Sequence, residues 1–565
     1  MAGIAGSAVP PPVAQAETGV RESPHPASVK VGKLTAPADQ NIVETNAGKV
    51  LGYRRGPIYT FKGVPYGAPT GGANRFRPPQ PATPWSGIKS CMSFGATSPD
   101  NFGILEPNAR APWGDEDAFL LYRGFEHTLA SEDCLRLNVF TSGLADSTKR
   151  PVMVYMHGGG YSGGSGHDLK CYEGTALAEA HDVVVVTHNH RLNVFGFMNL
   201  EEIGGERYID SANTGLLDIV AVLQWIKENI ARFGGDPNRV MIFGQSGGGG
   251  KVGCLMAMPA AKGLFHAAAV QSGSILRAAE PESSSDLAGK VLAELGFGKS
   301  DLSKLETAST EDLMTAARRA ILKLSAGFNP ATLMRMNRSI PGWGPTRDGR
   351  SLPTHPFDPT APAIGADIPM IIGTNEHEFI NGCDNPDVGT LSDADLNQRV
   401  QCQFGNAASG IIAAYKSYYP NRTPFDIYAA IMASGPRSGA FTQGLRKAAQ
   451  NRAPVYEYIY SWNTPVLSGR PGTFHSAEIT MVFNNAAYCD RYTGGGAEAV
   501  ALADKMSSAW VALAREGKPQ SRGLPEWPAY DEQNKQVMIF EAQGRVEKDP
   551  EGDGLRLIEA ALANK

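Results

Sequence analysis

The most informative segment of the chain is Arg239-Val240-Met241-Ile242-Phe243-Gly244-Gln245-Ser246-Gly247-Gly248. Its first half is an apolar run that predicts a buried strand. Its second half has the pattern Gly-x-Ser-x-Gly, which places a serine on a sharp strand-to-helix turn with its hydroxyl exposed. The segment therefore predicts a nucleophilic serine, Ser246, at the end of a strand.

A second glycine motif, His157-Gly158-Gly159-Gly160, follows another apolar run over residues 151–156. A loop of this type supplies backbone N–H groups that can bind a developing oxyanion. The pattern Gly-x-Ser-x-Gly by itself often arises by chance in loops. Because both motifs occur, and in this order, we favour a catalytic serine over a glycine-rich linker.

Strands and helices alternate through the rest of the chain. Continuous apolar runs, typical of parallel strands buried on both faces, occupy residues 152–156, 183–187, 240–243, 368–373 and 455–460. Helices are predicted over residues 215–233, 276–340, 390–452 and 506–516. Short strands with glycine turns between residues 41 and 61 predict an antiparallel edge. This order predicts a doubly wound α/β sheet.

Composition narrows the class of protein. The 565 residues are 42% hydrophobic and 19% charged, which is typical of a globular chain, and the net charge is −5. This charge gives no attraction to nucleic acid, and no apolar run is long enough to span a membrane. Residues 1–40 are rich in Ala, Pro, Gly and Ser and predict a disordered tail or a trimmed export segment. Residues 41–565 are expected to form one domain.

Further segments share a pattern with a known family: Phe61–Tyr66, Arg75–Pro79, Ser131–Val139, Asn213–Asp218 and Phe233–Pro237. Together with the two glycine motifs they resemble the type-B carboxylesterase/cholinesterase family of α/β-hydrolases, from about residue 41 to 540. The resemblance implies the α/β-hydrolase fold, in which helices flank a large, mostly parallel central sheet with loop and helical insertions. It also implies a serine carboxylic-ester hydrolase acting on a small-molecule ester, with no metal and no organic cofactor.

A serine nucleophile needs a base and an orienting acid, which follow it in the order acid, then His in this fold. His475 lies in a segment that resembles the family's Gly-x-x-His-x-x-Glu pattern, so we expect it to be the base. Two acids, Glu376 and Glu378, follow the strand that ends at Gly373. The family spacing of five residues after that glycine favours Glu378, although the next residue, usually Gly, is Phe379 here.

By the same resemblance, the oxyanion donors are the backbone N–H groups of Gly159, Gly160 and Gly247. Relatives usually carry Ala at the last position. The missing methyl predicts space beside Ser246 and tolerance of bulky esters; the alternative is sequence drift that packing compensates. Ser272 resembles a buried serine near the triad and is expected to support it, or else to cap a helix.

The histidines near the second motif allow two interpretations. His188 and His190 form a His-x-His pattern, which can ligate a metal, but no Cys, Asp or Glu cluster accompanies them, so we favour packing. His157 is expected to hold its loop in shape rather than to act as a base.

The resemblance also implies a disulfide between Cys91 and Cys134, two of the seven cysteines. That bond fits an oxidising compartment, so the protein is expected to be periplasmic or secreted, with a cytoplasmic location left open. Cys383 and Cys402 form a weaker candidate pair, and Cys254 is expected to be a core thiol.

Two other functions stay open. A lipase-like esterase for longer acyl chains would need an apolar lid, and the segment 95–130 is only modestly apolar. A non-catalytic binding module, as in cell-adhesion relatives of the family, would have lost the nucleophile, whereas Ser246 is present. The aromatic side chains Trp113, Phe119, Trp343 and Phe379 line a substrate gorge or belong to the core.

Overall fold

A computed structural model describes residues 34–35, 40–100, 119–124, 128–325, 342–380 and 382–563. Its centre is a twelve-stranded sheet with the order β1-β4-β5-β7-β9-β8-β10-β11-β12-β13-β14-β15. From β9 through β14 all neighbours are parallel, and the pairs on either side of this block are antiparallel. A separate sheet has the order β2-β3-β6.

The strands are β1 (Leu34–Thr35), β2 (Ile42–Glu44), β3 (Lys49–Leu51), β4 (Tyr53–Arg55), β5 (Ile58–Pro65), β6 (Ile88–Ser90), β7 (Arg136–Thr141), β8 (Arg150–Met156), β9 (Val184–His188), β10 (Gly235–Gln245), β11 (Ala267–Gln271), β12 (Met370–Asn375), β13 (Val455–Tyr460), β14 (Gln536–Phe540) and β15 (Arg545–Lys548). The α-helices are α2 (Thr175–His181), α3 (Asn193–Phe197), α4 (Glu201–Gly204), α5 (Thr214–Asn229), α6 (Gly247–Leu255), α7 (Pro281–Glu294), α8 (Thr310–Ser325), α9 (Asp393–Phe404), α10 (Ala408–Tyr418), α11 (Pro424–Met432), α12 (Ser434–Ala448), α13 (Ile479–Val482), α14 (Asp490–Thr493), α15 (Ala497–Glu516) and α16 (Gly552–Ala563).

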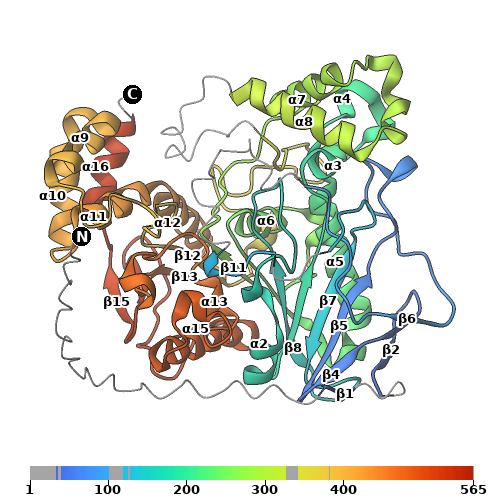
Figure 1. Ribbon diagram of the computed structural model, residues 1–565, viewed down its shortest axis with the longest axis horizontal. Helices are drawn as coiled ribbons and strands as arrows, with labels where there is room; N and C mark the ends of the chain where they lie inside the picture. The colour runs from blue at the N-terminus through green and yellow to red at the C-terminus, as the bar shows by residue number, and fades with distance from the viewer. Residues whose placement is uncertain are drawn as a thin grey trace, which may run out of the picture.

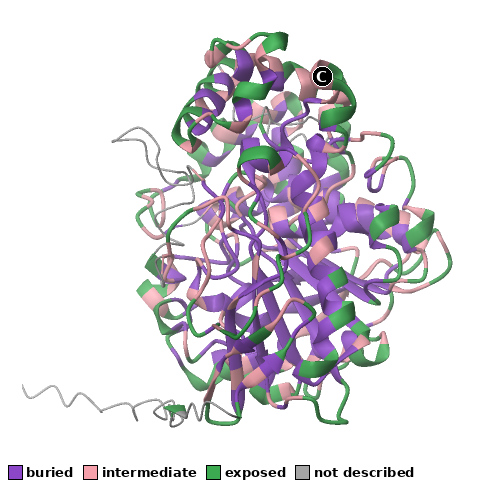
Figure 2. Cartoon of the chain, turned by 90° about the vertical axis from the view of Figure 1, so that its right-hand side faces the viewer, coloured by how far each residue is buried: buried purple, intermediate pink, exposed green. Residues whose placement is uncertain are grey.

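Alternation along the central strands builds two cores, one on each face of the sheet. In β8, Val152 and Val154 pack into the core that contains α5 and α6, whereas Met153 and Tyr155 pack into the core that contains α2 and α15. Because successive side chains of a strand point to opposite faces, a strand buried on both sides has to be apolar throughout. Figure 2 shows this burial in the central strands of the sheet.

Helices α9, α10, α11 and α16 lie together at one corner of the molecule (Figure 1). They share a third apolar cluster, separate from the two sheet cores, that includes Leu396, Ile411, Phe425 and Ile558. Helix α16 therefore joins the last segment of the chain to helices that start about 150 residues earlier.

The sequence predictions of an antiparallel edge, of the parallel strands and of the helices α5, α7, α8 and α9–α12 are confirmed. Strands β11, β14 and β15 and helix α16 were not predicted. The prediction of a disordered tail over 1–40 falls almost wholly outside the described residues, as does the last part of the helical prediction over 276–340. Among the described residues, no helix is long and apolar enough to cross a membrane.

Candidate active site

Neighbouring parallel strands bring the sequence motifs to one edge of the sheet. The loop from His157 to Gly160, called the glycine loop below, follows β8; Ser246 follows β10; and Glu378 follows β12. The strands β8, β10, β11 and β12 are consecutive in the sheet, so these loops are neighbours in space. Ligand sites of open α/β sheets lie at this edge.

Ser246 occupies the sharp turn between β10 and α6. Its backbone has φ 57° and ψ −127°, a conformation that side-chain-bearing residues rarely adopt. The Ser246 N–H continues the β10–β11 ladder by donating to the Gln271 carbonyl at 2.8 Å, and its carbonyl accepts from the Gly250 N–H at 3.1 Å. The strain is thus held by the strand on one side and by the helix on the other.

The position after Ser246 has no free space. A Cβ placed on Gly247 would lie 2.1 Å from the carbonyl oxygen of Gly160 and 2.5 Å from its Cα. The prediction that the missing methyl leaves room for bulky esters is therefore wrong, because the backbone of the glycine loop fills that room. A Cβ on Gly248 would lie 2.0 Å from the Met156 carbonyl oxygen. Helix α6 can approach the glycine loop this closely only because its first turn is glycine.

His475 and Glu378 form a short contact beside this turn. Glu378 Oε2 lies 2.5 Å from His475 Nδ1, and the His475 backbone N–H donates to the Glu378 carbonyl at 2.7 Å. The second carboxylate oxygen, Oε1, accepts from the Asn375 backbone N–H at 2.9 Å. Since a carboxylate only accepts, Nδ1 carries the imidazole proton and Nε2 is left as the acceptor.

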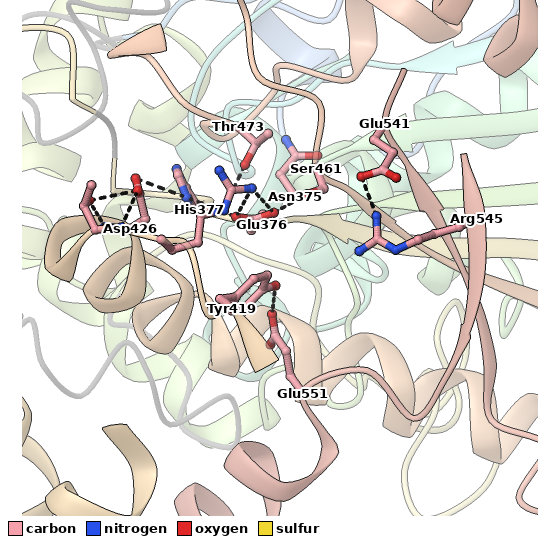
Figure 3. A network of polar contacts seen from close by, with 12 residues as sticks. Asn375, Glu376, His377, Tyr419, Asp426, Ser461, Thr473, Glu541, Arg545 and Glu551 are labelled. Atoms are coloured by element: carbon pink, nitrogen blue, oxygen red, sulfur yellow. Dashed lines mark hydrogen bonds and ion pairs between the residues drawn. The ribbon is translucent and has the colours of Figure 1, made fainter. Parts of the chain in front are cut away.

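Glu376, the other acid that the sequence left open, points away from the imidazole of His475. Its carboxylate pairs with Arg422 at 2.8 Å, lies 3.4 Å from His377 Nε2 and accepts from the Ser461 hydroxyl. Figure 3 shows His377 and Ser461 beside Glu376. Burial opposes ionisation, but the hydrogen bond and the charge of His377, together with Arg422 and Ser461, hold the pKa of Glu376 at about 2.

Two side chains that the sequence analysis did not place beside the base contact His475. The amide nitrogen of Gln245 lies 3.1 Å from His475 Nε2, so it donates to the lone pair that a nucleophile would need. The ring of Phe379, 42% exposed, lies over the imidazole with 4.2 Å between centroids and 34° between planes. Gln245 and Phe379 directly adjoin Ser246 and Glu378 in the sequence, and this adjacency is the signal that could have identified them.

A second buried carboxylate, Glu478, lies behind Glu378. It accepts from the Asn375 side-chain amide at 2.6 Å and from Gln271 at 3.4 Å. Burial, followed by the charge of Glu378, raises its pKa to about 7. Glu478 therefore carries a proton in part of the molecules at neutral pH, which limits the negative charge beside Glu378.

The end of β12, which precedes Glu376 and Glu378, is held by Arg437 of α12. Its guanidinium donates to the Asn375 carbonyl at 2.7 Å and to the Thr374 hydroxyl at 3.2 Å, and it forms an ion pair with Glu551. Both charged side chains are fully buried. Glu551 also accepts from Tyr419 at 2.5 Å (Figure 3). This pair links the loop after β12 to Glu551, the residue that precedes α16.

The remaining predicted residues have these positions. Ser272 is 9% exposed, with φ 48°, and its N–H donates to the Gly373 carbonyl at 2.8 Å at the end of β11. Cys91 and Cys134 are both buried, and the structure has them as free thiols. The structure therefore does not show the disulfide, which stays a prediction. Trp343 is buried and Phe119 is exposed, while Trp113 lies outside the described residues.

Three histidines pack behind the glycine loop. The ring centroids of His157 and His190 are 4.6 Å apart, and those of His188 and His190 are 5.4 Å apart. Within the ranges that the structure describes, no group of three His, Cys, Asp or Glu side chains is placed to hold a metal ion.

Comparison with known proteins gives a consistent result. The sequence model of the Carboxylesterase family matches residues 39–557. The para-nitrobenzyl esterase of Bacillus subtilis (strain 168) is 32% identical over 517 residues, which are 91% of this chain and 97% of the relative. The fumonisin B1 esterase of Sphingopyxis macrogoltabida is 33% identical over 510 residues, 88% of this chain and 86% of the relative.

Solved structures of esterases have the same fold as this chain. A Clostridium hathewayi esterase, described as able to hydrolyse aliphatic aromatic polyesters, has a TM-score of 0.79 and 30% identity, covering 94% of this chain and 99% of its own. A carboxylesterase of Geobacillus stearothermophilus has a TM-score of 0.72 and 33% identity, covering 92% of this chain and 100% of its own. These matches confirm the α/β-hydrolase fold. The chain therefore belongs to the carboxylesterase family, of type B, and it is a carboxylesterase.

Proposed function

We propose that Ser246, His475 and Glu378 form the catalytic triad of this carboxylesterase. The observation that carries the proposal is the 2.5 Å contact between Glu378 and His475 beside the strained turn at Ser246. The contact fixes the tautomer in which Nε2 can accept a proton. Glu376 is the weaker candidate, because its carboxylate is already committed to Arg422 and Ser461.

The reaction begins when the Ser246 hydroxyl replaces the Gln245 amide at His475 Nε2. Ser246 Oγ bonds to the ester carbonyl carbon while its proton passes to Nε2, and Glu378 stabilises the imidazolium that forms. The carbon–oxygen bond to the alcohol then breaks, and the alcohol leaves with the proton from Nε2. Water repeats the sequence on the acyl-enzyme, releases the acid and restores the serine.

The oxyanion hole is proposed to consist of the N–H groups of Gly159, Gly160 and Gly247. Its support is the close approach of the glycine loop to the turn: a Cβ on Gly158 would lie 3.5 Å from Ser246 Cβ. Each donor of this kind contributes roughly 3–4 kcal/mol to the transition state. Because backbone fills the space beside Ser246, we propose small to medium esters as substrates. The alternative of a lid for longer acyl chains falls on residues that are largely outside the described ranges.

Substitution of the nucleophile and the base tests the proposal. Ser246→Ala and His475→Ala should each lower kcat by several orders of magnitude with the circular-dichroism spectrum and Tm retained, because triad members act as a unit. His266→Ala is the control, since this exposed histidine precedes β11 at the other end of the sheet. An organophosphate probe should label the parent and not Ser246→Ala. Labelling of both, or activity within about tenfold of the parent, would refute the triad and favour another function.

We propose a periplasmic or secreted location, which a Cys91–Cys134 disulfide would fit.

A further inference from the structure

Helix α6 carries a fully buried lysine, Lys251, on the turn that follows the nucleophile. Its Nζ donates to the His157 carbonyl at 3.0 Å and lies 5.7 Å from the centroid of the Tyr161 ring. An ammonium group without water is costly unless it is paired. In the described part of the chain no carboxylate forms an ion pair with Lys251.

The groups that face Lys251 are almost all neutral. Burial, and to a smaller extent the charge of Lys251, keeps the pKa values of His157, His188 and His190 well below their ordinary range. The pKa of His188 is about 3. Burial also raises the pKa of Tyr161, so its hydroxyl is neutral.

A carboxylate acts on Lys251 only from a distance. The charge of Asp168 raises the pKa of Lys251, but Asp168 itself is paired with Arg123 at 2.9 Å. Burial outweighs this effect and lowers the pKa of Lys251 to about 7.

One hydrogen bond connects this buried charge to the glycine loop, and a second one lies within the loop itself. Lys251 donates to the His157 carbonyl, and His157 Nδ1 lies 2.9 Å from the Gly158 carbonyl oxygen. Since a carbonyl only accepts, Nδ1 carries the hydrogen. The Gly158 carbonyl and the Gly159 N–H belong to one peptide group, so a hydrogen bond to the oxygen makes the N–H a better donor.

We propose that Lys251 is a positioning residue for the oxyanion hole: from behind the glycine loop its ammonium charge and hydrogen bond favour negative charge on the substrate carbonyl oxygen. This rests on the proposed function, because it takes Gly159 and Gly160 as the oxyanion donors. The lysine never touches the ester. It acts by its charge and through the His157–Gly158 peptide group, whose carbonyl accepts its hydrogen bond.

The proposal fixes the sign of a pH effect. Below its pKa Lys251 is charged and supports the oxyanion; above it the amine is neutral and the support is lost. The kcat/KM of the parent should therefore fall as the pH rises through about 7 to 8. Glu478, beside Glu378, also has a pKa of about 7 and ionises in the same range. The limb is therefore assigned to Lys251 only if substitution of Lys251 removes it.

The test compares two buried lysines on a small uncharged ester such as para-nitrophenyl acetate. Lys251→Met removes the charge and keeps the volume. It should lower kcat/KM about tenfold near pH 6, and it should abolish the alkaline limb. Lys251→Arg stays charged at every pH and should also lack the limb, but with activity retained near pH 9.

The control is Lys447→Met. Lys447 of α12 is likewise buried, donates to a backbone carbonyl, that of Ala366, at 2.7 Å, and has a pKa lowered to about 8 by burial. Its variant should keep the limb of the parent. A limb that persists in Lys251→Met, or one that Lys447→Met also loses, overturns the proposal. If neither Lys251 variant folds, a flat parent profile above about pH 7 overturns it. Ser246→Ala separately decides the nucleophile, so failure of the triad and failure of Lys251 are told apart.

Discussion

At the scale of single residues, the distinction between Glu378 and Glu376 is the sharpest result of the site. The two carboxylates are two positions apart and both are buried, yet one faces the imidazole and the other faces Arg422. Sequence spacing favoured Glu378, and the contacts give a physical reason for that preference. Gln245 and Lys251 could not be found in this way, because their partners, His475 and His157, lie 230 and 94 positions away in the chain.

The two acids should therefore respond differently to the same substitution. Glu378→Gln should lower kcat by about 10³- to 10⁴-fold with little change in Tm, because it leaves the imidazole in place but favours the wrong tautomer. Glu376→Gln should lower Tm and keep kcat within about tenfold, because Arg422 and His377 lose their carboxylate partner. The reverse ranking in steady-state kinetics would assign the acid to Glu376.

The stability effect of Glu376 should depend on pH. Its pKa is about 2 in the folded protein against an ordinary 4.5, so its ionised form stabilises the fold at neutral pH. That contribution is present above about pH 4.5 and is lost as the pH falls toward 2. The Tm difference between parent and Glu376→Gln should accordingly shrink in thermal scans between pH 7 and pH 3. A constant difference would mean that the carboxylate charge is not the cause.

At the scale of elements, helix α6 is defined by the glycines of its first turn. Helix propensity alone disfavours four consecutive glycines, by roughly 1 kcal/mol each relative to alanine. The contacts explain the choice, since a Cβ on Gly247 or Gly248 would overlap the backbone of β8 and the glycine loop. The sequence predicted the helix and the loop but not their separation, which depends on the packing of both against the sheet.

Gly247→Ala should consequently lower kcat/KM on linear and hindered esters alike, by about tenfold or more, because the glycine loop must move away from Ser246. Gly289→Ala is the matched control: Gly289 lies in α7, and a Cβ there meets no atom within 4 Å. That variant should leave kinetics unchanged and stabilise the protein by up to about 1 kcal/mol. If Gly247→Ala retained full activity on linear esters, the packing explanation would be wrong.

Strand β11 shows what element prediction from the sequence cannot reach. Its residues Ala267-Ala268-Ala269-Val270-Gln271 carry almost no β-branched or aromatic side chains. They form a strand because they are fully buried between β10 and β12, where both neighbours offer a parallel ladder. Small side chains also let helices pack closely over this part of the sheet, so tertiary context overrides local propensity.

At the scale of the whole molecule, the sequence predicted most of the parallel block but missed β11 and β14 within it, the antiparallel edge strand β15 and the closing helix α16. The central strands carry long apolar runs, whereas β15, Arg-Val-Glu-Lys, is polar and half-exposed. Its pairing with β14 comes from the chain reversal between them rather than from composition. The edge strand thus gives too weak a local signal to be recognised without its partner.

Whether Cys91 and Cys134 are bonded bears on the compartment in which the protein folds. Burial raises the pKa values of Cys91 and Cys134 to about 11 and 12, so as thiols they are protonated and unreactive at neutral pH. After export to an oxidising compartment, mass spectrometry of the unreduced protein should find a peptide pair joined through these two residues. Cys254, a buried core thiol, should remain free in the same sample. Two free thiols at Cys91 and Cys134 would contradict the disulfide and remove its support for export.

The buried pair of Arg437 and Glu551 makes the end of β12 depend on the last segment of the chain, which has a consequence for folding during synthesis. The ribosome delivers a chain from its N-terminus, so Glu551 emerges after Ser246, Glu378 and His475 have all been made. Until then the guanidinium has no carboxylate partner, and a buried charge without one costs several kcal/mol. We therefore expect the end of β12, which precedes Glu378, to be fixed only after the segment that carries Glu551 has docked. A chain truncated before residue 551 should leave the Arg437 guanidinium without its carboxylate partner and should hydrolyse esters far more slowly than the full chain.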